Sequence, residues 1–427
     1  MSQYSIMDRA ALKTEYAKLR EEYQGYQDKK LSLNMARGKP DAEQLDLSQA
    51  ILTSFNKAED CLCEDGTDCR NYGLLDGIPE AKRFFAELLS VREDELIVCG
   101  NSSLNLMYDT IVRCLIYGAG KGKTPWIHQG KVKFLCPVPG YDRHFAICQS
   151  LGIEMIPVPM TKTGPDMDIV EALVADDPMI KGIWCVPKYS NPDGVTYSDE
   201  TVRRFAALSP AADDFRVFWD NAYLVHDLYD EGDTLLNLLD LVRGGKNQDM
   251  VFEFFSTSKI SFPGAGVAVV ASSRANMDHT KSIMTVQTIG YNKLNMLRHV
   301  QYFKDAAGVK AHMKRHAELL RPKFEAVLTA FDRALKPLGI VSYTAPRGGY
   351  FISLDTMPGC ATRVFQLMKE AGVTMTNVGA TFPYGKDPED KNLRIAPSFP
   401  PLDEVIVATD ILICAVKMAT IEKLLEQ

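Results

Sequence analysis

The chain has 427 residues, of which 46% are hydrophobic and 24% charged, and its formal net charge at pH 7 is −7. This composition is typical of a globular protein with two domains, or with one large domain and a smaller lobe. The acidic balance argues against nucleic acid or an anionic membrane as the main partner. The apolar segment 405–421 contains Asp410 and Lys417, so it predicts a packed helix and not a membrane span.

The N-terminal residues predict a charged amphipathic helix and not a signal peptide, so we expect a cytoplasmic protein. Most of the ten cysteines lie in apolar segments, where we expect buried thiols. Cys61, Cys63 and Cys69 form a cluster, but their spacing is not that of a zinc site and no histidine pair accompanies them. We therefore expect no metal.

Three regions follow one another along the chain. Residues 1–45 begin with the helix, which we expect to join a C-terminal lobe. In residues 46–310, short apolar runs alternate with helical segments, which predicts an α/β domain with a mostly parallel seven-stranded sheet between helices. The seven expected strands lie within 95–100, 131–140, 153–160, 180–187, 215–220, 249–256 and 266–272.

The remaining region, 311–427, predicts a smaller α+β domain. A long helical span with breaks covers about 293–339. A strand at 348–354, a helix at 362–372, a strand at 392–398 and a final helix follow.

Five of the expected strands end in polar, turn-forming loops. Because the carboxyl ends of parallel strands meet at one edge of a sheet, these loops can converge on one pocket. They are GNSS (100–103), PGYDRH (139–144), KYSNPDG (188–194), DNAY (220–223) and STSK (256–259).

Each loop has more than one interpretation. GNSS could bind a phosphate at a helix start, or Asn101 or Ser102 could simply cap that helix. Tyr141 could stack on an aromatic ligand or belong to the core. Asn191, which precedes a proline, could bind a ligand oxygen or cap its own turn.

Asp220 ends one apolar strand, and Lys259 lies in the turn that follows another. A buried carboxylate needs a cationic partner, and Lys259 could form a plain ion pair with Asp220. A lysine in a Ser- and Gly-rich turn could instead be a Schiff-base nucleophile, activated by desolvation.

The full set, comprising Tyr72, the five loops and NLRIAPS (392–398), resembles the fold-type-I aminotransferases that depend on pyridoxal 5'-phosphate. The order and spacing match over nearly the whole chain. The segments ARGKPDAEQLDLS (36–48), GNSSLNLM, PKYSNPDG and KLNMLRH (293–299) are similar to the MocR-like branch, which includes the subgroup Ic aspartate aminotransferases.

The resemblance implies a role for each residue around the cofactor ring. Lys259 would form the internal aldimine and move the proton. Asp220 would pair with the pyridine nitrogen, and His144 would orient Asp220. Tyr223 and Asn191 would bind the phenolic oxygen of the ring.

Other roles follow from the same resemblance. Tyr141 would stack on the ring, and Tyr72 would reach the phosphate of the other subunit in a homodimer. The remaining residues implied at the phosphate are Asn101, Ser102, Ser103 and Ser256.

For the substrate, the resemblance implies that Arg394 binds the α-carboxylate with its planar fork and that Gly38 lies against the substrate. Arg143 could bind a second carboxylate, or form an ion pair with Asp142 or another acid. The first alternative favours L-aspartate and 2-oxoglutarate. Kynurenine, 2-aminoadipate or alanine with glyoxylate are the other substrates to consider.

One position departs from many of these relatives. Gly266 stands where they carry an arginine that binds the cofactor phosphate. The positive charge would then come from elsewhere, and Lys293, Arg298 and Arg37 are the candidates.

Two rival functions find less support. GAGKGKT (118–124) lacks the first glycine and the preceding strand of a phosphate-binding P-loop. A ligand-sensing transcriptional regulator would need a DNA-binding domain, for which the first 35 or so residues are too short. The fold also supports decarboxylases, lyases and racemases, but Arg394 and the resemblance favour transamination.

Overall fold

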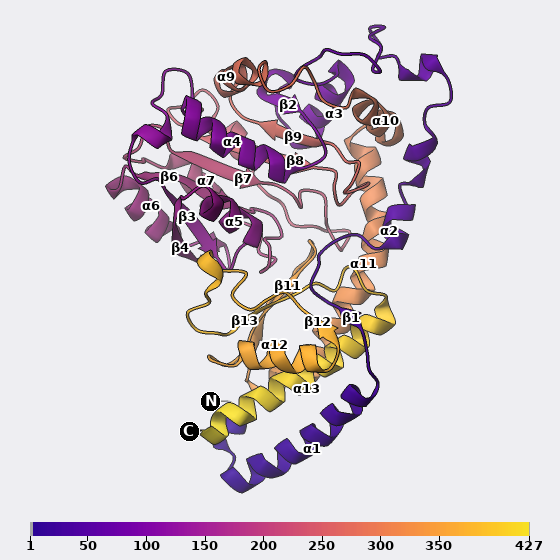
Figure 1. Cartoon of the computed structure of the whole chain (residues 1–427), viewed down its shortest axis with the longest axis vertical. Helices are drawn as coiled ribbons and strands as arrows, with labels where there is room; N and C mark the ends of the chain where they lie inside the picture. The colour runs from indigo at the N-terminus through magenta and orange to yellow at the C-terminus, as the bar shows by residue number, and fades with distance from the viewer. Residues whose placement is uncertain (1–2, 427) are drawn as a thin grey trace.

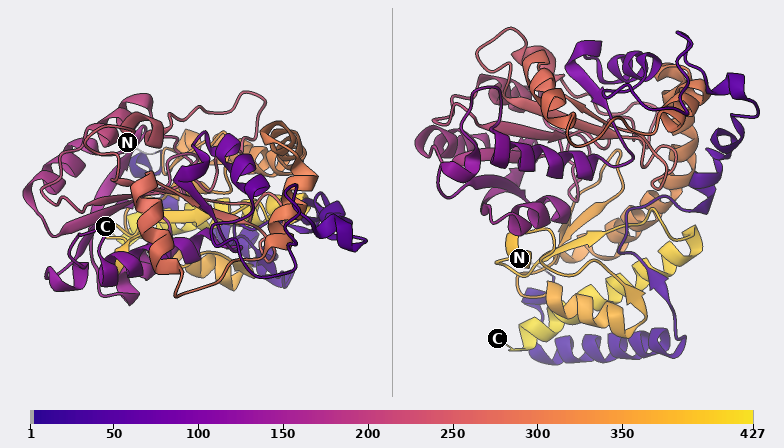
Figure 2. Two further views of the ribbon diagram at one scale, coloured as in Figure 1. Left: turned by 90° about the horizontal axis from the view of Figure 1, so that it is seen from above. Right: turned by 45° about the horizontal axis from the view of Figure 1, so that its top comes forward.

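The structure is a computed structural model that describes residues 3–426. Two lobes are stacked along the long axis of the molecule, the large one around a sheet and the small one carrying both chain ends (Figure 1). Helix α11 (Ala306–Ala334) runs along one side from the large lobe into the small one (Figures 1 and 2). The predicted α/β architecture is confirmed.

The large lobe contains a sheet with the strand order β2-β9-β8-β7-β6-β3-β4-β5. Its strands are β2 (Leu96–Val98), β3 (Lys133–Val138), β4 (Glu154–Thr161), β5 (Gly164–Pro165), β6 (Ile180–Cys185), β7 (Arg216–Asp220), β8 (Val251–Ser256) and β9 (Ala268–Ala271). All seven predicted strands are present. The eighth, β5, was not predicted because two residues are too few to show a hydrophobic pattern.

Strands β3, β4, β6, β7 and β8 are parallel, and β9 is antiparallel to both β8 and β2. Strand β2 therefore points the same way as β8, so its carboxyl end lies at the same edge of the sheet.

Alternation along the strands divides the large lobe into two cores. Phe218 and Phe254 pack against one set of helices, while Val217 and Phe255 pack against the other. The first set is α4 (Ser103–Tyr117), α5 (Asp142–Ser150) and α9 (Arg274–Met284). The second set is α3 (Pro79–Leu89), α6 (Met167–Asp176), α7 (Asp199–Ala207), α8 (Leu238–Val242) and α10 (Lys293–Phe303). Burial on both faces explains why these strands are apolar throughout.

The small lobe combines both ends of the chain. Its elements are α1 (Arg9–Asp28), β1 (Leu33–Asn34), β10 (Ser342–Tyr343), β11 (Ile352–Asp355), α12 (Ala361–Glu370), β12 (Val373–Thr374), β13 (Asn392–Ile395) and α13 (Leu402–Glu426). Helix α1 lies along α13 (Figure 1), where Cys414 donates a hydrogen bond to the carbonyl of Leu19. The domain boundaries near residues 45 and 310 stay predictions.

The predicted long helical span is broken between α10 and α11. Lys304 has a φ of 69°, and the side chain of Asp305 caps the start of α11. Short helix α2 (Ala42–Asp46) packs beside α11 through a hydrogen bond between Gln44 and His316. Across residues 3–426, no helix is both long and apolar enough to cross a membrane.

Three buried histidines from α10 and α11 lie under the turn that contains Lys259. Nδ1 of His299 donates to the carbonyl of Asn295 at 2.6 Å, and its Nε2 accepts from Ser261 at 2.8 Å. Nε2 of His312 donates to the carbonyl of Ile260 at 2.9 Å and lies 3.0 Å from Nε2 of His316. Burial lowers the pKa of His299 to about 4 and that of His316 to about 3.

These lowered pKa values predict a loss of stability in mild acid. An unfolded histidine titrates near pH 6.5. Below this pH the unfolded chain therefore binds protons at positions 299 and 316, whereas the folded chain does not. Each histidine then removes up to about 1.4 kcal/mol per pH unit from the free energy of unfolding. Urea unfolding at pH 7.0, 6.0 and 5.0 measures this slope.

His316→Gln should make the pH dependence shallower, whereas His128→Gln, which changes an exposed histidine, should leave it unchanged. Equal slopes for the native chain and His316→Gln would contradict this account of the buried histidines.

Candidate active site

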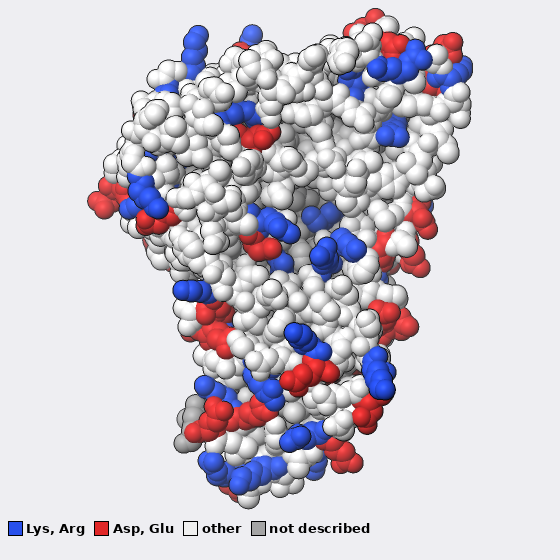
Figure 3. Space-filling view, viewed as in Figure 1, with Lys and Arg blue, Asp and Glu red and all other residues white. Residues whose placement is uncertain are grey.

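A cavity of about 230 Å³ lies at the carboxyl ends of the parallel strands. The loops after β2, β3, β6, β7 and β8 all reach it, as the sequence predicted. Two of its residues, Gly38 and Phe351, come from outside the large lobe. The others are Ser102, Ser103, Leu104, Met107, Tyr141, Val186, Asn191, Asp220, Ala222, Tyr223, Ser256, Ser258 and Lys259. The surface is hollowed between the lobes, with Lys and Arg side chains around the hollow (Figure 3).

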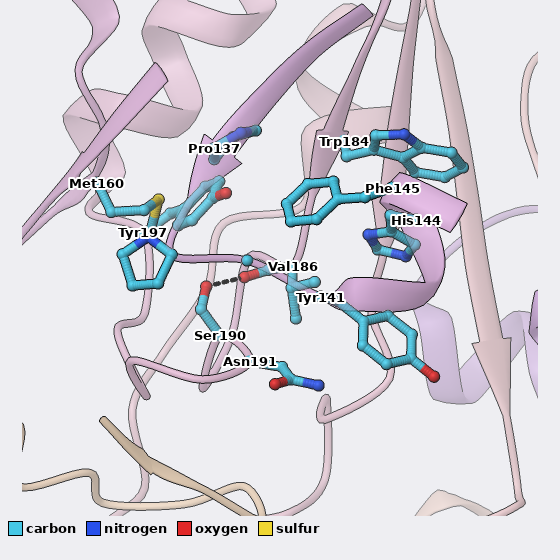
Figure 4. A pocket seen from close by; sticks show the side chains of 12 residues that line it. Pro137, Tyr141, His144, Phe145, Met160, Trp184, Val186, Ser190, Asn191 and Tyr197 are labelled. Carbon is cyan, nitrogen blue, oxygen red and sulfur yellow. Dashed lines mark hydrogen bonds between the residues drawn. The ribbon is translucent and has the colours of Figure 1, made fainter. Parts of the chain in front are cut away.

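Asp220 is held in place from one side only. Nε2–H of His144 donates to Oδ2 of Asp220 at 3.0 Å, while Oδ1 is buried and has no partner among the described residues. The His144 ring stacks on Trp184 of β6, with 4.2 Å between centroids and 7° between planes (Figure 4). The free oxygen leaves a place for a ligand that carries a hydrogen-bond donor.

Tyr141 lines the cavity together with Asp220. Its ring meets His144 edge-on, and both line a small pocket that Asn191 also reaches (Figure 4). Burial, assisted by Asp220, raises the pKa of Tyr141 to about 12, so its hydroxyl stays protonated at neutral pH. The cavity thus has an aromatic wall beside a buried carboxylate.

Lys259 follows β8 and projects between aromatic rings. Its Nζ is 5.0 Å from the ring centroid of Tyr223 and 5.9 Å from that of Tyr350. Burial lowers the pKa of Lys259, and the charge of Asp220 opposes that shift. No direct ion pair joins Lys259 and Asp220 among the described residues, so the plain ion-pair alternative is not seen. The amine is placed to become a neutral nucleophile or base.

The hydroxyl-rich end of the cavity is formed by the start of α4 and the turn after β8. Ser102 caps α4, as one alternative held, and Asn101 donates from its amide to the carbonyl of Pro263. Ser256 donates to Ser258, which in turn donates to the carbonyl of Asn101. Hydroxyls and helix amides together suit an anion such as phosphate.

The three candidate phosphate cations do not line this cavity. Nζ of Lys293 donates to the carbonyl of Gly73 at 3.0 Å. Arg298 bonds to the side chain of Asn295, and Arg37 is exposed on the N-terminal segment.

Arg394 lies on β13 of the small lobe and points toward the large lobe, where it contacts Asp142 and Asn191. Nη1 donates to Oδ1 of Asp142 at 2.7 Å and lies 3.3 Å from Oδ1 of Asn191. Its guanidinium lies 5.0 Å from the ring centroid of Phe351. Arg143, for which an ion pair with Asp142 was one of two alternatives, is exposed, and no ion pair of Arg143 is found in residues 3–426.

Tyr72 lies outside the cavity. Its side chain is 82% exposed and lines a second hollow of about 480 Å³, formed by residues 69–73 and 290–294.

The residues at the site to which sequence reasoning gave no role include Trp184, Phe351 and Ser258, and it considered Asp142 only as a partner of Arg143. Phe351 and Ser258 line the cavity, while Trp184 contacts His144 and Asp142 contacts Arg394. Trp184 lies within an apolar strand, where only the three-dimensional stacking distinguishes it from a core residue.

Comparison with known proteins finds aspartate aminotransferases among the relatives of this chain. The sequence matches the family described as aspartate amino-transferase over residues 7–427. It is 43% identical to the aspartate aminotransferase of Corynebacterium glutamicum, over 99% of each chain. A crystal structure of an aspartate transaminase from that organism superposes with a TM-score of 0.96, also at 43% identity and 99% coverage of each chain.

A more distant structure shares the fold alone. The α-aminoadipate aminotransferase LysN of Thermus thermophilus, solved with N-(5'-phosphopyridoxyl)-L-leucine, gives a TM-score of 0.73 at 22% identity. The comparison covers 91% of this chain and 93% of that one. The predicted fold type is therefore confirmed.

The contact between Gly38 and Phe351 predicts a sensitive position. A Cβ on residue 38 would lie 2.3 Å from Cζ of Phe351, so Gly38→Ala must displace the ring that lies against Arg394. We expect the affinity for succinate, a dicarboxylate probe, to fall by about tenfold, the effect of weakening one hydrogen bond to a charged group. Titration calorimetry measures it.

Gly25→Ala is the matched control, because a Cβ at that position meets nothing within 4 Å. Undiminished succinate binding by Gly38→Ala would show that Phe351 does not support the carboxylate site.

Proposed function

Because this chain belongs to the aspartate aminotransferase family, and is thus a pyridoxal 5'-phosphate-dependent transaminase, we propose that it converts L-aspartate and 2-oxoglutarate to oxaloacetate and L-glutamate. The observation that carries this choice is the whole-length relationship to the aspartate aminotransferase of C. glutamicum. The MocR-like branch suggested by the sequence segments is part of the same proposal.

The residues of the cavity fit pyridoxal phosphate. The unpartnered Oδ1 of Asp220 would accept from the protonated ring nitrogen, and Tyr141 would cover the ring. Ser102, Ser103 and Ser256 would bind the phosphate. When bound, the cofactor withdraws electrons from the carbon that loses a proton.

The other groups act on the substrate. Arg394 would bind the α-carboxylate and orient the Cα–H bond toward Nζ of Lys259. The lowered pKa of Lys259 favours a neutral amine that can take that proton and return it. Asn191 and Tyr223 would bind the ring oxygen, and Gly38 leaves room for the substrate.

We also propose a homodimer with shared sites, in which Tyr72 reaches the phosphate bound by its partner. Three exposed apolar side chains support such a contact: Tyr72, Val286 and Ile289, at 82%, 82% and 62% exposure. Cytoplasmic localisation stays a prediction.

The first test is the visible absorbance spectrum of the purified protein. L-Aspartate should bleach the cofactor band, and 2-oxoglutarate should restore it, because the two half-reactions run in turn. A band that ignores aspartate but responds to kynurenine or 2-aminoadipate would remove the aspartate assignment. Lys259→Ala should lose the native band and reduce turnover by about 10²- to 10⁴-fold or more. A native band in this variant would refute the role of Lys259.

Arg143 provides a test of the second carboxylate. If it binds the distal carboxylate, Arg143→Ala should lower kcat/KM for L-aspartate by about 30-fold or more and leave that for L-alanine nearly unchanged. Steady-state kinetics with both amino acids measure the ratio. An equal loss for both would exclude Arg143 as the distal clamp.

A further inference from the structure

The ion pair between Arg394 and Asp142 joins the two lobes at the site. Arg394 belongs to β13 of the small lobe, and Asp142 is the first residue of α5 in the large lobe. Their side chains are 8% and 31% exposed, so the pair lies at the border between the protein interior and solvent. It is the only ion pair that the structure records for Arg394 in residues 3–426.

The donors of the guanidinium show what this pair occupies. Nη1 donates to Oδ1 of Asp142 at 2.7 Å and to Oδ1 of Asn191 at 3.3 Å. Nε lies 3.4 Å from the hydroxyl of Thr376. A substrate carboxylate binds best through two parallel N–H bonds. Nη1 already donates to two acceptors, so a carboxylate that takes parallel N–H bonds from Nη1 and Nη2 competes with Oδ1 of Asp142.

We propose that Asp142 is an internal carboxylate that occupies Arg394 in the unliganded site and is displaced by the α-carboxylate of the substrate. This inference rests on the proposed function, since it takes Arg394 as the α-carboxylate site. Asp142 therefore lowers the affinity for amino acid and oxo acid alike, because both must first release it.

The surroundings of Asp142 lower the free-energy cost of moving it away from Arg394. Helix α5 has no side-chain cap, since its N-cap residue is Tyr141. A carboxylate in the first turn is stabilised by the free amides and the dipole at that end of the helix. The neighbouring Arg143 is exposed and unpaired among the described ion pairs, and nearly a third of the Asp142 side chain reaches solvent.

The contact of Asp142 with Arg394 is monodentate, which explains how the substrate α-carboxylate can displace it. Asp142 reaches Arg394 through one oxygen, whereas the α-carboxylate can use two. Asn191 is able to keep its own contact with Arg394 throughout, so the guanidinium stays oriented when its partner changes.

The test compares succinate binding to the cofactor-loaded enzyme and its variants by titration calorimetry. Succinate has no amino group, so it binds without reacting. Asp142→Asn keeps the size of the side chain and removes its charge, and we expect about tenfold tighter binding. KM for L-aspartate and for 2-oxoglutarate should fall together. Asp142→Glu keeps the charge and should bind succinate as weakly as the native enzyme.

Asp199→Asn is the matched control, because Asp199 is also the first residue of a helix, α7, and within residues 3–426 its ion pair is with exposed Arg203. It should bind succinate like the native enzyme. Unchanged or weaker binding by Asp142→Asn, with a native cofactor spectrum, would overturn the inference and indicate that Asp142 is indifferent or orients Arg394.

The inference and the proposed substrates can fail separately. If the native enzyme transaminates L-aspartate but Asp142→Asn binds succinate no more tightly, only the inference is wrong. If Asp142→Asn binds succinate more tightly but the native enzyme does not act on L-aspartate, the substrate assignment is wrong and the displacement of Asp142 stands.

Discussion

The carboxylate of Asp220 sets the main physical constraint on this molecule. A buried carboxylate is costly unless its oxygens are hydrogen-bonded, yet Oδ1 has no partner among the described residues and only His144 serves Oδ2. The stack of His144 on Trp184 fixes the single donor that remains. The sheet supports this arrangement because β7 is buried between β6 and β8 along its whole length. The stability of the large lobe thus maintains an unsatisfied acceptor at the floor of the cavity.

Positive charge in the site is divided between the lobes. Lys259 belongs to the large lobe, where burial opposes its protonation, while Arg394 arrives from the small lobe and is already paired. Binding a carboxylate at Arg394 therefore depends on how the lobes meet. Phe351 and Gly38 are packed at this junction, so their close contact influences the position of the guanidinium.

Much of this could be predicted from the sequence because strand ends carry distinct polar residues. The seven strands were predictable from apolar runs bounded by turns, and the convergence of five loops followed from parallel strands alone. The partner of Asp142 could not be predicted, because residues 142 and 394 are far apart in the chain and Arg143 is the adjacent cation. Trp184 was missed because a residue inside an apolar strand shows its role only through a contact with the helix packed on the sheet, here with His144 of α5. Gly38 was implied by resemblance, but its clash with Phe351 required the structure.

Gly266 shows how one local constraint changes the chemistry around it. A Cβ there would lie 3.0 Å from both the carbonyl of Phe262 and the hydroxyl of Thr257, and Thr257 already accepts from the amide of Val267. The carbonyl of Gly266 accepts from Asn295 at 2.6 Å, which closes the turn from the other side. A side chain in this place would have to push these two groups back by a few tenths of an ångström.

The glycine at position 266 also affects the hydroxyl-rich end of the cavity. With a glycine in the turn, the groups that face an anion there are hydroxyls and the amides at the start of α4, which are neutral donors. Dipoles oriented by a rigid helix can hold a phosphate without a full positive charge nearby. For the proposed phosphate, this compact turn leaves neutral donors in place of a direct positive charge.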